Sequence, residues 1–262
     1  MKQIHKYPRT QHIEGSRLQP GDEDLDAIPF ERIANRNIVV EEKVDGANCG
    51  ISFTSDGQLQ LQSRGHFLTG GPREKHFALF KQWATTHQSA LFERLDDRFV
   101  MYGEWLYAKH TIFYDALPHY FMEFDILDVA SSEFLSTSRR KELLVGLPIV
   151  SVRVLFEGNL NRKKTLTDLL GESHFISHGH LERLGGRAND LGTDVDRVFR
   201  ETDRSSKMEG LYIKVEEDDV VTERYKYIRP DFLTAVFAAE SHWLNRPIVP
   251  NLLLDDAEIF AP

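Results

Sequence analysis

The sequence has almost no cysteine. Cys49 is the single one among 262 residues, which excludes an internal disulfide and a cysteine-rich zinc site. Long apolar runs are also missing: no stretch approaches the roughly 18 apolar residues of a membrane span, and the opening MKQIHKYPRTQH lacks the apolar core of a signal peptide. We therefore expect a cytoplasmic protein that depends on packing for its structure and does not enter a membrane.

The chain also lacks an excess of positive charge. Its 32 basic and 41 acidic residues give a net charge of −9, so any nucleic-acid site must be local. One candidate is the basic N-terminal stretch, which also contains Tyr7. A solvated basic tail is the alternative for its charged residues, which are Lys2, His5, Lys6, Arg9, His12 and Arg17.

No repeat, low-complexity tract or linker marks a domain boundary, and an apolar content of 41% is enough for the core of one large domain. Runs that are alternating or rich in β-formers, several of them bounded by turn residues, predict strands. They cover Ile38–Lys43, Asn48–Thr54, Gln58–Ser63, Phe99–Tyr107, Tyr120–Leu127, Leu211–Val215 and Val220–Tyr227.

Helical patterns lie between and after these runs, and Pro230 suits the first turn of the last of them. Turn residues Ser55-Asp56-Gly57 and Glu216-Glu217-Asp218-Asp219 each predict a hairpin. The class is therefore α+β with antiparallel sheet. The predicted helices are Glu74–His87, Ser138–Val145, Thr165–Leu170, Thr193–Thr202 and Pro230–Asn245.

The segment Lys43-Val44-Asp45-Gly46-Ala47-Asn48 follows an apolar β run and contains a glycine turn. Such a turn would hold a lysine amine at the rim of a sheet, where it can act as a nucleophile. By itself K-x-D-G is a weak signal, because most such tetrapeptides are only turns.

Further short elements follow in a fixed order. They are Ser63-Arg64-Gly65, Tyr102-Gly103-Glu104-Trp105, Phe121-Met122-Glu123-Phe124-Asp125, Glu209-Gly210-Leu211-Tyr212-Ile213-Lys214 and Arg224-Tyr225-Lys226. With K-V-D-G they resemble motifs I, Ia, III, IIIa, IV and V of the covalent nucleotidyltransferases, the superfamily of ligases and mRNA capping enzymes. The spacing of Asn48 from Lys43 is similar to that in ATP-dependent RNA ligases of the RNA ligase 2 type.

This resemblance implies a nucleotidyltransferase (adenylyltransferase) domain of antiparallel β-sheets and flanking helices, with a core like that of ATP-grasp ligases. We expect this domain over residues 1–229, with the basic N-terminal segment included. A short helical C-terminal tail would follow over residues 230–262, with no OB-fold.

The resemblance also implies an activity. An RNA 3′-hydroxyl and an RNA 5′-phosphate would be joined through a covalent lysyl-AMP on Lys43 and an RNA-adenylate, in RNA repair. The cofactors would be ATP and Mg²⁺ or Mn²⁺, and the partners RNA ends and end-processing proteins.

Lys43 must attack the α-phosphorus of ATP as a neutral amine, although the pKa of an unperturbed lysine is about 10.4. We expect Lys214 and Lys226 to lower the pKa of Lys43 and to stabilise phosphate charge, which makes these three the predicted catalytic residues. The alternative for each is an exposed strand residue.

The resemblance assigns nucleotide contacts to further residues. Glu104 would accept hydrogen bonds from ribose hydroxyls, Phe124 would stack on adenine, and Asp45 would bind the nucleotide. Glu209 would hold a metal ion or a phosphate-facing lysine. An edge-strand glutamate and a core phenylalanine are the alternatives for Glu104 and Phe124.

Two polar residues complete the predicted site. The guanidinium of Arg64 suits bidentate phosphate binding, and we favour the RNA 5′-phosphate over the nucleotide as its ligand. Asn48 would contact the nucleotide or the reacting 3′ end, and a turn-capping role is its alternative.

Motif V departs from the usual pair of lysines separated by one residue, because the chain has Arg224 and Lys226. Either these two or Lys226 and Arg229 form the operative pair.

Other functions remain open. The same chemistry on nicked DNA or in a capping reaction is one alternative, and a nucleotide- or RNA-end-binding protein without turnover is another. A metal site at His174, His178 and His180 is disfavoured for want of cysteine partners, and Cys49 is expected to be small core filler rather than a nucleophile.

Overall fold

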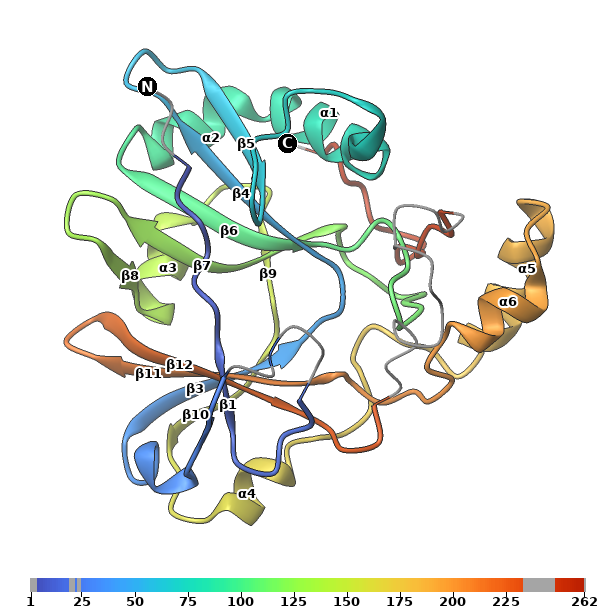
Figure 1. The fold of residues 1–262 in the computed structure, drawn as a ribbon. Coiled ribbons are helices and arrows are strands. Elements are labelled where there is room, and N and C mark those ends of the chain that lie inside the picture. Colours follow the sequence, from blue (N-terminus) through green and yellow to red (C-terminus); the bar gives the residue numbers. More distant parts are fainter. Residues whose placement is uncertain (1–3, 19–21, 23–24, 233–247, 262) are drawn as a thin grey trace.

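The computed structural model describes residues 4–18, 22, 25–232 and 248–261 (Figure 1). In this part of the chain the strands form one 12-stranded sheet, whose main path is β10-β3-β11-β12-β8-β7-β6-β4-β5. Neighbours along the path pair antiparallel. The strands of the path are β3 (Asn37–Lys43), β4 (Ala47–Phe53), β5 (Leu59–Ser63), β6 (Phe99–Trp105), β7 (Phe121–Asp128), β8 (Glu133–Leu135), β10 (Val154–Asn159), β11 (Gly210–Glu217) and β12 (Val220–Ile228).

The sheet has two halves, which lie one above the other in Figure 1. The β3 half consists of β10, β3, β11 and β12, and the β6 half consists of β7, β6, β4 and β5. Strand β8 joins them, and it pairs with β12 and with β7 through two residue pairs each. Three short strands lie off this path and pair parallel to it or to one another: β1 (Gln11–Ile13), β2 (Ala27–Ile28) and β9 (Val150–Ser151).

Helices α1 (Ala78–Thr86) and α2 (Gln88–Leu95) cover one face of the β6 half (Figure 1). Phe80 and Trp83 recur at helical spacing in α1 and are fully buried. The Phe80 ring lies 5.2 Å from that of Trp105 on β6 and 5.4 Å from that of Phe121 on β7. The other helices are η1 (Phe30–Arg32), η2 (Pro72–Phe77), α3 (Thr137–Leu143), α4 (Lys163–Thr167), α5 (His180–Asp190) and α6 (Val195–Arg200).

All seven predicted strands are present, with ends shifted by no more than two residues. Both predicted hairpins are confirmed as well, as β4–β5 and β11–β12. At the second turn Asp218 and Asp219 have φ values of 50° and 63°, the left-handed conformation that a tight hairpin turn needs. The turn therefore matches the right-handed twist of the two strands.

The helix predictions are less accurate. The pattern over 74–87 gives a 3₁₀ turn followed by α1, with α2 directly after it, and the predictions over 138–145, 165–170 and 193–202 correspond to α3, α4 and α6. The sequence reading missed η1, α2 and α5. Most of the predicted helix Pro230–Asn245 lies outside the described residues.

The N-terminal segment packs against both halves of the sheet, so it is not a solvated tail. The carbonyl of His5 accepts hydrogen bonds from Gln62 Nε2 at 2.7 Å and from the Tyr102 hydroxyl at 2.8 Å, in the β6 half. Further along, β1 pairs with β12 in the β3 half, where Gln11 lies opposite Tyr225. Figure 1 shows this segment crossing from one half to the other.

Residues 248–261 return to the domain without forming a helix. The Asn251 side chain accepts from the backbone N–H of Tyr114 at 3.0 Å and donates to the Leu106 carbonyl at 2.7 Å.

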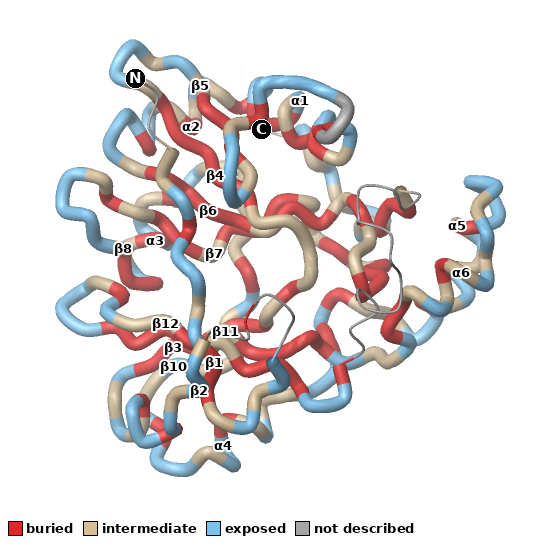
Figure 2. The backbone as a smooth tube through the Cα atoms, in the orientation of Figure 1, coloured by how far each residue is buried: buried red, intermediate tan, exposed pale blue. Residues whose placement is uncertain are grey.

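Buried residues follow the strands in both halves of the sheet (Figure 2). Cys49 is a buried member of the core on β4, as expected. Among the helices described here, none has the length and apolar content needed to cross a bilayer.

Candidate active site

A cavity of about 700 Å³ lies between the two halves of the sheet, within the size range of small-molecule sites. Lys43, Tyr212 and Lys226 line it from the β3 half, and Asn48 and Phe124 from the β6 half. Further lining residues come from the N-terminal segment and from the loops after β5 and β6, together with Val152 after β9 and Ile248.

Lys43 is the last residue of β3, and the five residues before it are buried. The chain then turns through Gly46 into β4, and a side chain at Gly46 would meet the Leu106 side chain and the Trp105 carbonyl at 2.7 Å. Lys43 Nζ lies 2.7 Å from Glu209 Oε2, and the Lys43 side chain is 23% exposed. The turn therefore presents the amine at the cavity, as the sequence predicts.

The expectation that neighbouring cations lower the pKa of Lys43 is wrong for this arrangement. Burial alone would lower this pKa, but the carboxylates of Glu209, Glu104 and Asp45 outweigh it, and the pKa of Lys43 is raised. The amine is therefore held as an ammonium by an acidic surround.

Glu104 on β6 is the register partner of Asn48 on β4, so both side chains reach the cavity from adjacent strands. Glu104 Oε1 accepts a hydrogen bond from the Gly46 N–H at 3.2 Å. Burial, with the nearby carboxylates of Glu209 and Asp45, raises the pKa of Glu104 to about 8, although Lys43 opposes the shift. At neutral pH this carboxyl therefore keeps its proton most of the time.

Asp45 lines the cavity, and its carboxylate has backbone partners. Asp45 Oδ2 accepts hydrogen bonds from the N–H groups of Thr111 at 2.7 Å and Ile112 at 3.0 Å. The imidazole of His110 lies 3.9 Å from the other oxygen. Asp45 therefore fastens the loop after β6 to the turn that follows Lys43.

Phe124 and Asp125 are neighbours on β7 and have different surroundings. Phe124 lines the cavity, with its ring centroid 5.2 Å from that of Tyr7 and 6.1 Å from that of Tyr212. Asp125 is fully buried and pairs with Lys214 and Arg224. Only the aromatic residue of the two is therefore open to a bound base.

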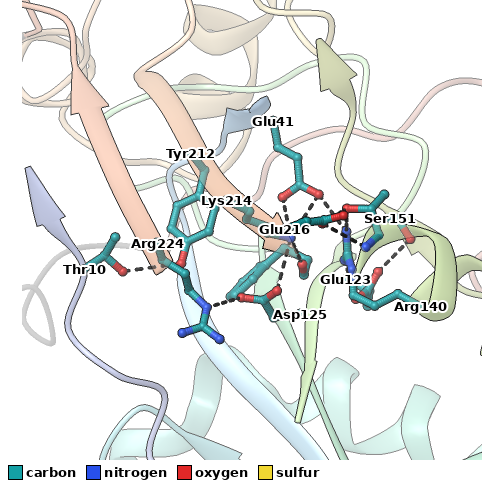
Figure 3. A network of polar contacts seen from close by, with 12 residues as sticks. Thr10, Glu41, Glu123, Asp125, Arg140, Ser151, Tyr212, Lys214, Glu216 and Arg224 are labelled. Atoms are coloured by element: carbon teal, nitrogen blue, oxygen red, sulfur yellow. Dashed lines mark hydrogen bonds and ion pairs between the residues drawn. The ribbon is translucent and has the colours of Figure 1, made fainter. Parts of the chain in front are cut away.

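The predicted cations separate into two groups. Lys226 on β12 lines the cavity beside Lys43 and pairs with Asp22, and burial together with Lys43 lowers the pKa of Lys226. Lys214 is fully buried and binds Glu41 at 2.9 Å and Asp125 at 3.1 Å (Figure 3). The structure thus places Lys226 at the cavity and Lys214 behind its wall.

Neither arginine of motif V lines the cavity. Arg224 binds Asp125, and its guanidinium carbon lies 3.6 Å from the centre of the Phe134 ring. Arg229 is buried and pairs with Asp203 and Asp231. In the described part of motif V and its flank, Lys226 is therefore the cation nearest the predicted nucleophile.

Arg64 and Glu209 complete the predicted set. Arg64 is exposed at the cavity, one residue after β5 ends. Glu209 is buried directly before β11 and binds Lys43. Across the described residues, no group of three or more His, Cys, Asp or Glu side chains is arranged to hold a metal ion. Glu209 as a metal ligand thus stays a prediction.

Several lining residues were missed from sequence. Thr10 comes from the N-terminal segment, and Lys109 and His110 come from the loop after β6. Tyr7, which the sequence indicates only as part of the basic N-terminal stretch, also lines the cavity. Nothing local marks Thr10, because it reaches the cavity only through long-range pairing. Tyr212 could have been found, since it lies two residues before Lys214 on the same face of β11.

Comparison with solved structures shows that the fold is that of RNA ligases. The chain matches a lysine-to-alanine mutant of the Naegleria gruberi RNA ligase with ATP and Mn at 17% identity and a TM-score of 0.52, over 86% of this chain and 56% of that one. A glutamate-to-alanine mutant with AMP and Mn matches at 16% identity and 0.52, over the same shares. The protein thus spans little more than half of each ligase.

The family follows from the sequence. The RNA ligase family matches residues 36–228, which is most of the chain, so the protein belongs to the RNA ligase family. No curated protein matches it.

Proposed function

We propose that this protein is an ATP-dependent RNA ligase that works through a covalent lysyl-AMP on Lys43. One observation carries the proposal: the Lys43 amine opens into a cavity of about 700 Å³ that also holds an aromatic face, that of Phe124, and a second lysine, Lys226. Family membership and the Naegleria ligases solved with ATP or AMP and Mn support ATP as the nucleotide.

In the first step the deprotonated Lys43 amine attacks the α-phosphorus of ATP. A P–N bond forms and the bond to pyrophosphate breaks, while Lys226 stabilises the charge on the phosphates. Phe124 stacks on the adenine, and Glu104 binds the ribose. Glu209 lies in contact with the amine, where it can take the proton that Lys43 must lose.

The carboxylate of Glu209 would hold Mg²⁺ or Mn²⁺, which prefer oxygen ligands and substrate phosphates. A divalent cation there would neutralise the charge of Glu209, which is the carboxylate that raises the pKa of Lys43 most, and so would favour the neutral amine.

In the second step a 5′-phosphate oxygen of RNA attacks the phosphorus of lysyl-AMP. The P–N bond breaks, the lysine takes back a proton, and an RNA-adenylate forms. In the third step an RNA 3′-hydroxyl attacks that 5′-phosphate, and AMP leaves. Arg64, exposed at the cavity, is placed to bind the phosphate of the incoming end. The buried free thiol of Cys49 supports a reducing compartment such as the cytoplasm.

Intact mass spectrometry tests the proposal. The protein, first freed of bound nucleotide with pyrophosphate, is incubated with Mg²⁺ and either ATP, GTP or NAD. We expect an AMP-sized gain with ATP and none with Lys43→Ala. A gain with GTP would indicate a capping-type enzyme, and no gain with any nucleotide would indicate a binding protein. Sealing of nicked DNA in preference to RNA would assign the DNA ligase alternative.

A further inference from the structure

A network of buried charges lies behind the cavity wall (Figure 3). It joins strands of both halves of the sheet through helix α3. The three cations balance the three anions, and every side chain is almost or fully excluded from solvent except that of Arg224, which is 14% exposed. Its members are Glu41 on β3, Glu123 and Asp125 on β7, Arg140 on α3, Lys214 on β11 and Arg224 on β12.

Arg140 connects the two halves of the sheet within this network. Its Nη2 donates to Glu41 Oε1 at 2.7 Å in the β3 half, and its Nη1 donates to Glu123 Oε1 at 2.6 Å in the β6 half. Ser151 on β9 donates to the other oxygen of Glu123 at 2.7 Å. One planar guanidinium therefore fixes two carboxylates that belong to different halves of the sheet.

The start of α3 is fastened to the β3 half as well. Glu216 on β11 accepts hydrogen bonds from the Thr137 backbone N–H at 2.8 Å and from its hydroxyl at 2.6 Å. The helix that carries Arg140 is thus held against the strands that it bridges.

The backbone connection between the halves is short by comparison. Strand β8 pairs with each half through two residue pairs only, and β3 and β7 are not neighbours in the sheet. The segment from β9 to β10 adds a second backbone link, in which Val152 N–H donates to the Glu123 carbonyl at 2.8 Å and Glu42 N–H donates to the Arg153 carbonyl at 3.0 Å. The Arg140 side chain lies between the same two strands, β3 and β7, and adds direct bonds between the halves to these backbone links.

The network also reaches the cavity. Glu41 lines the cavity two residues before Lys43 on the same strand, and Lys214 donates to the backbone carbonyl of Phe124. Arg140 does not line the cavity, but it holds a wall residue on the nucleophile's strand and, through β7, the strand of the aromatic face.

We propose that Arg140 is a positioning residue for nucleotide attachment: its bonds to Glu41 and Glu123 hold the two halves of the sheet at the separation from which Lys43 reaches the α-phosphorus. The inference rests on the proposed lysyl-AMP chemistry. It gives α3, which contributes no residue to the cavity lining described here, a function in the reaction.

The test compares Arg140→Met with wild type in single-turnover attachment of AMP. Small displacements of reacting groups cost rate more than binding, so we expect the rate at saturating ATP to fall by about 10-fold or more, with a smaller change in the ATP concentration that gives half the maximal rate. Arg140→Lys, which keeps the charge but loses the planar guanidinium that holds each carboxylate on a separate nitrogen, should be intermediate. Arg98→Met is the matched control: Arg98 makes two bonds to Asp128 at the far end of β7, away from the cavity.

A double variant separates positioning from stability. Arg140→Met with Glu123→Gln removes one cation and one anion, so the network stays neutral and much of the lost melting temperature should return. The attachment rate should stay low, because the bond to Glu41 is still missing. Recovery of both rate and melting temperature, or a normal rate in Arg140→Met, would overturn the inference. Failure of wild type to attach AMP would instead contradict the proposed function.

Discussion

Lys43, Lys214 and Lys226 have the same side chain in three different surroundings. Lys43 contacts the cavity and one carboxylate, Lys226 contacts the cavity and Asp22, and Lys214 is enclosed by carboxylates. Positive charge therefore occurs in two settings here: two amines face the cavity, and one neutralises buried acids.

Replacing Lys43 separates the first step from the last. Lys43→Ala removes the nucleophile, so AMP attachment from ATP should be abolished. RNA that already carries a 5′-adenylate bypasses this step, and the variant should still seal it, which gel analysis of both reactions would measure. Sealing from ATP at the wild-type rate would contradict the assignment of Lys43.

The two other lysines should respond in opposite ways. Lys214→Met leaves Glu41 with Arg140 and Asp125 with Arg224, but the network then has one buried negative charge in excess. We expect this to cost about 3–5 kcal/mol, or a melting temperature lower by about 10 °C. Lys226→Met should change the melting temperature little, because Asp22 keeps His12 and Arg9 as partners, yet it should slow AMP attachment. Calorimetry and single-turnover rates test the pair, and equal melting temperatures would count against a structural role for Lys214.

Glu104 should make stability depend on pH. In the folded chain its pKa is about 8, whereas an unfolded glutamate titrates near about 4.3, so between these values the folded state binds more protons. The stabilising effect of this proton is complete below the pKa that Glu104 has in the unfolded chain. It is lost as the pH rises through the pKa that Glu104 has in the folded chain.

Glu104→Gln cannot lose a proton. Its melting temperature relative to wild type should therefore rise from about pH 5 to about pH 9. Glu133→Gln, at an exposed position, is the control and should show no such trend. A constant difference between Glu104→Gln and wild type would mean that Glu104 titrates normally.

The predicted site residues were found from sequence because their spacing along strands is local. Lys43, Asn48, Glu104, Phe124, Glu209 and Lys226 all reach the cavity from strands or strand ends that were predicted. Lys214 shows the limit of that approach. Alternation places it on the inner face of β11, but it cannot show that Glu41 and Asp125 will enclose it there.

At the scale of elements, the contact between β11 and β12 controls the position of Glu209. Gly210 opens β11, and a side chain there would lie 2.1 Å from the Tyr227 carbonyl. With a side chain at position 210, strand β11 would have to move away from β12. Glu209, the residue before it, would move with the strand.

Gly210→Ala should therefore reduce AMP attachment strongly, by about 100-fold if Glu209 moves by about 1 Å. Gly186→Ala in α5 is the matched control, because a side chain there meets open space and alanine favours a helix. Intact mass after a fixed time with ATP measures both. Normal attachment in Gly210→Ala would show that the strands can separate without moving the site.

Elements with strong local signals were predicted correctly, and those formed by long-range contacts were not. The two hairpins carry their own turn residues, such as Gly57 with φ of +75°. Strands β1, β2, β8 and β9 are two or three residues long, and such short runs have no periodicity to read. Helix α5 begins within a histidine-rich stretch that resembles a loop, and it is held by apolar packing against residues such as Phe113 and Val249.

At the scale of the whole molecule, Tyr7 ties the halves together from the N-terminal side. Its hydroxyl donates to Asp125 in the β6 half and contacts the Tyr212 hydroxyl in the β3 half. Its buried ring packs against Phe124 and Tyr102.

Tyr7→Phe should cost about 1–3 kcal/mol, because a buried acid loses a donor, and Tyr7→Ala about 3–5 kcal/mol, because a cavity is added. Chemical denaturation measures both values. Equal losses would mean that only the hydroxyl matters, and no loss in either variant would mean that the segment does not tie the halves.

The pairing of β1 with β12 also bears on how the chain acquires its structure during synthesis. Gln11 meets Tyr225, so β1 must wait for its neighbour until the residues up to Tyr225 have been translated. Contacts so distant in sequence slow folding. Until then the nascent chain has β3, β4 and β6 but no β12 to supply Lys226, and we expect nucleotide binding to appear as one of the last events of its folding.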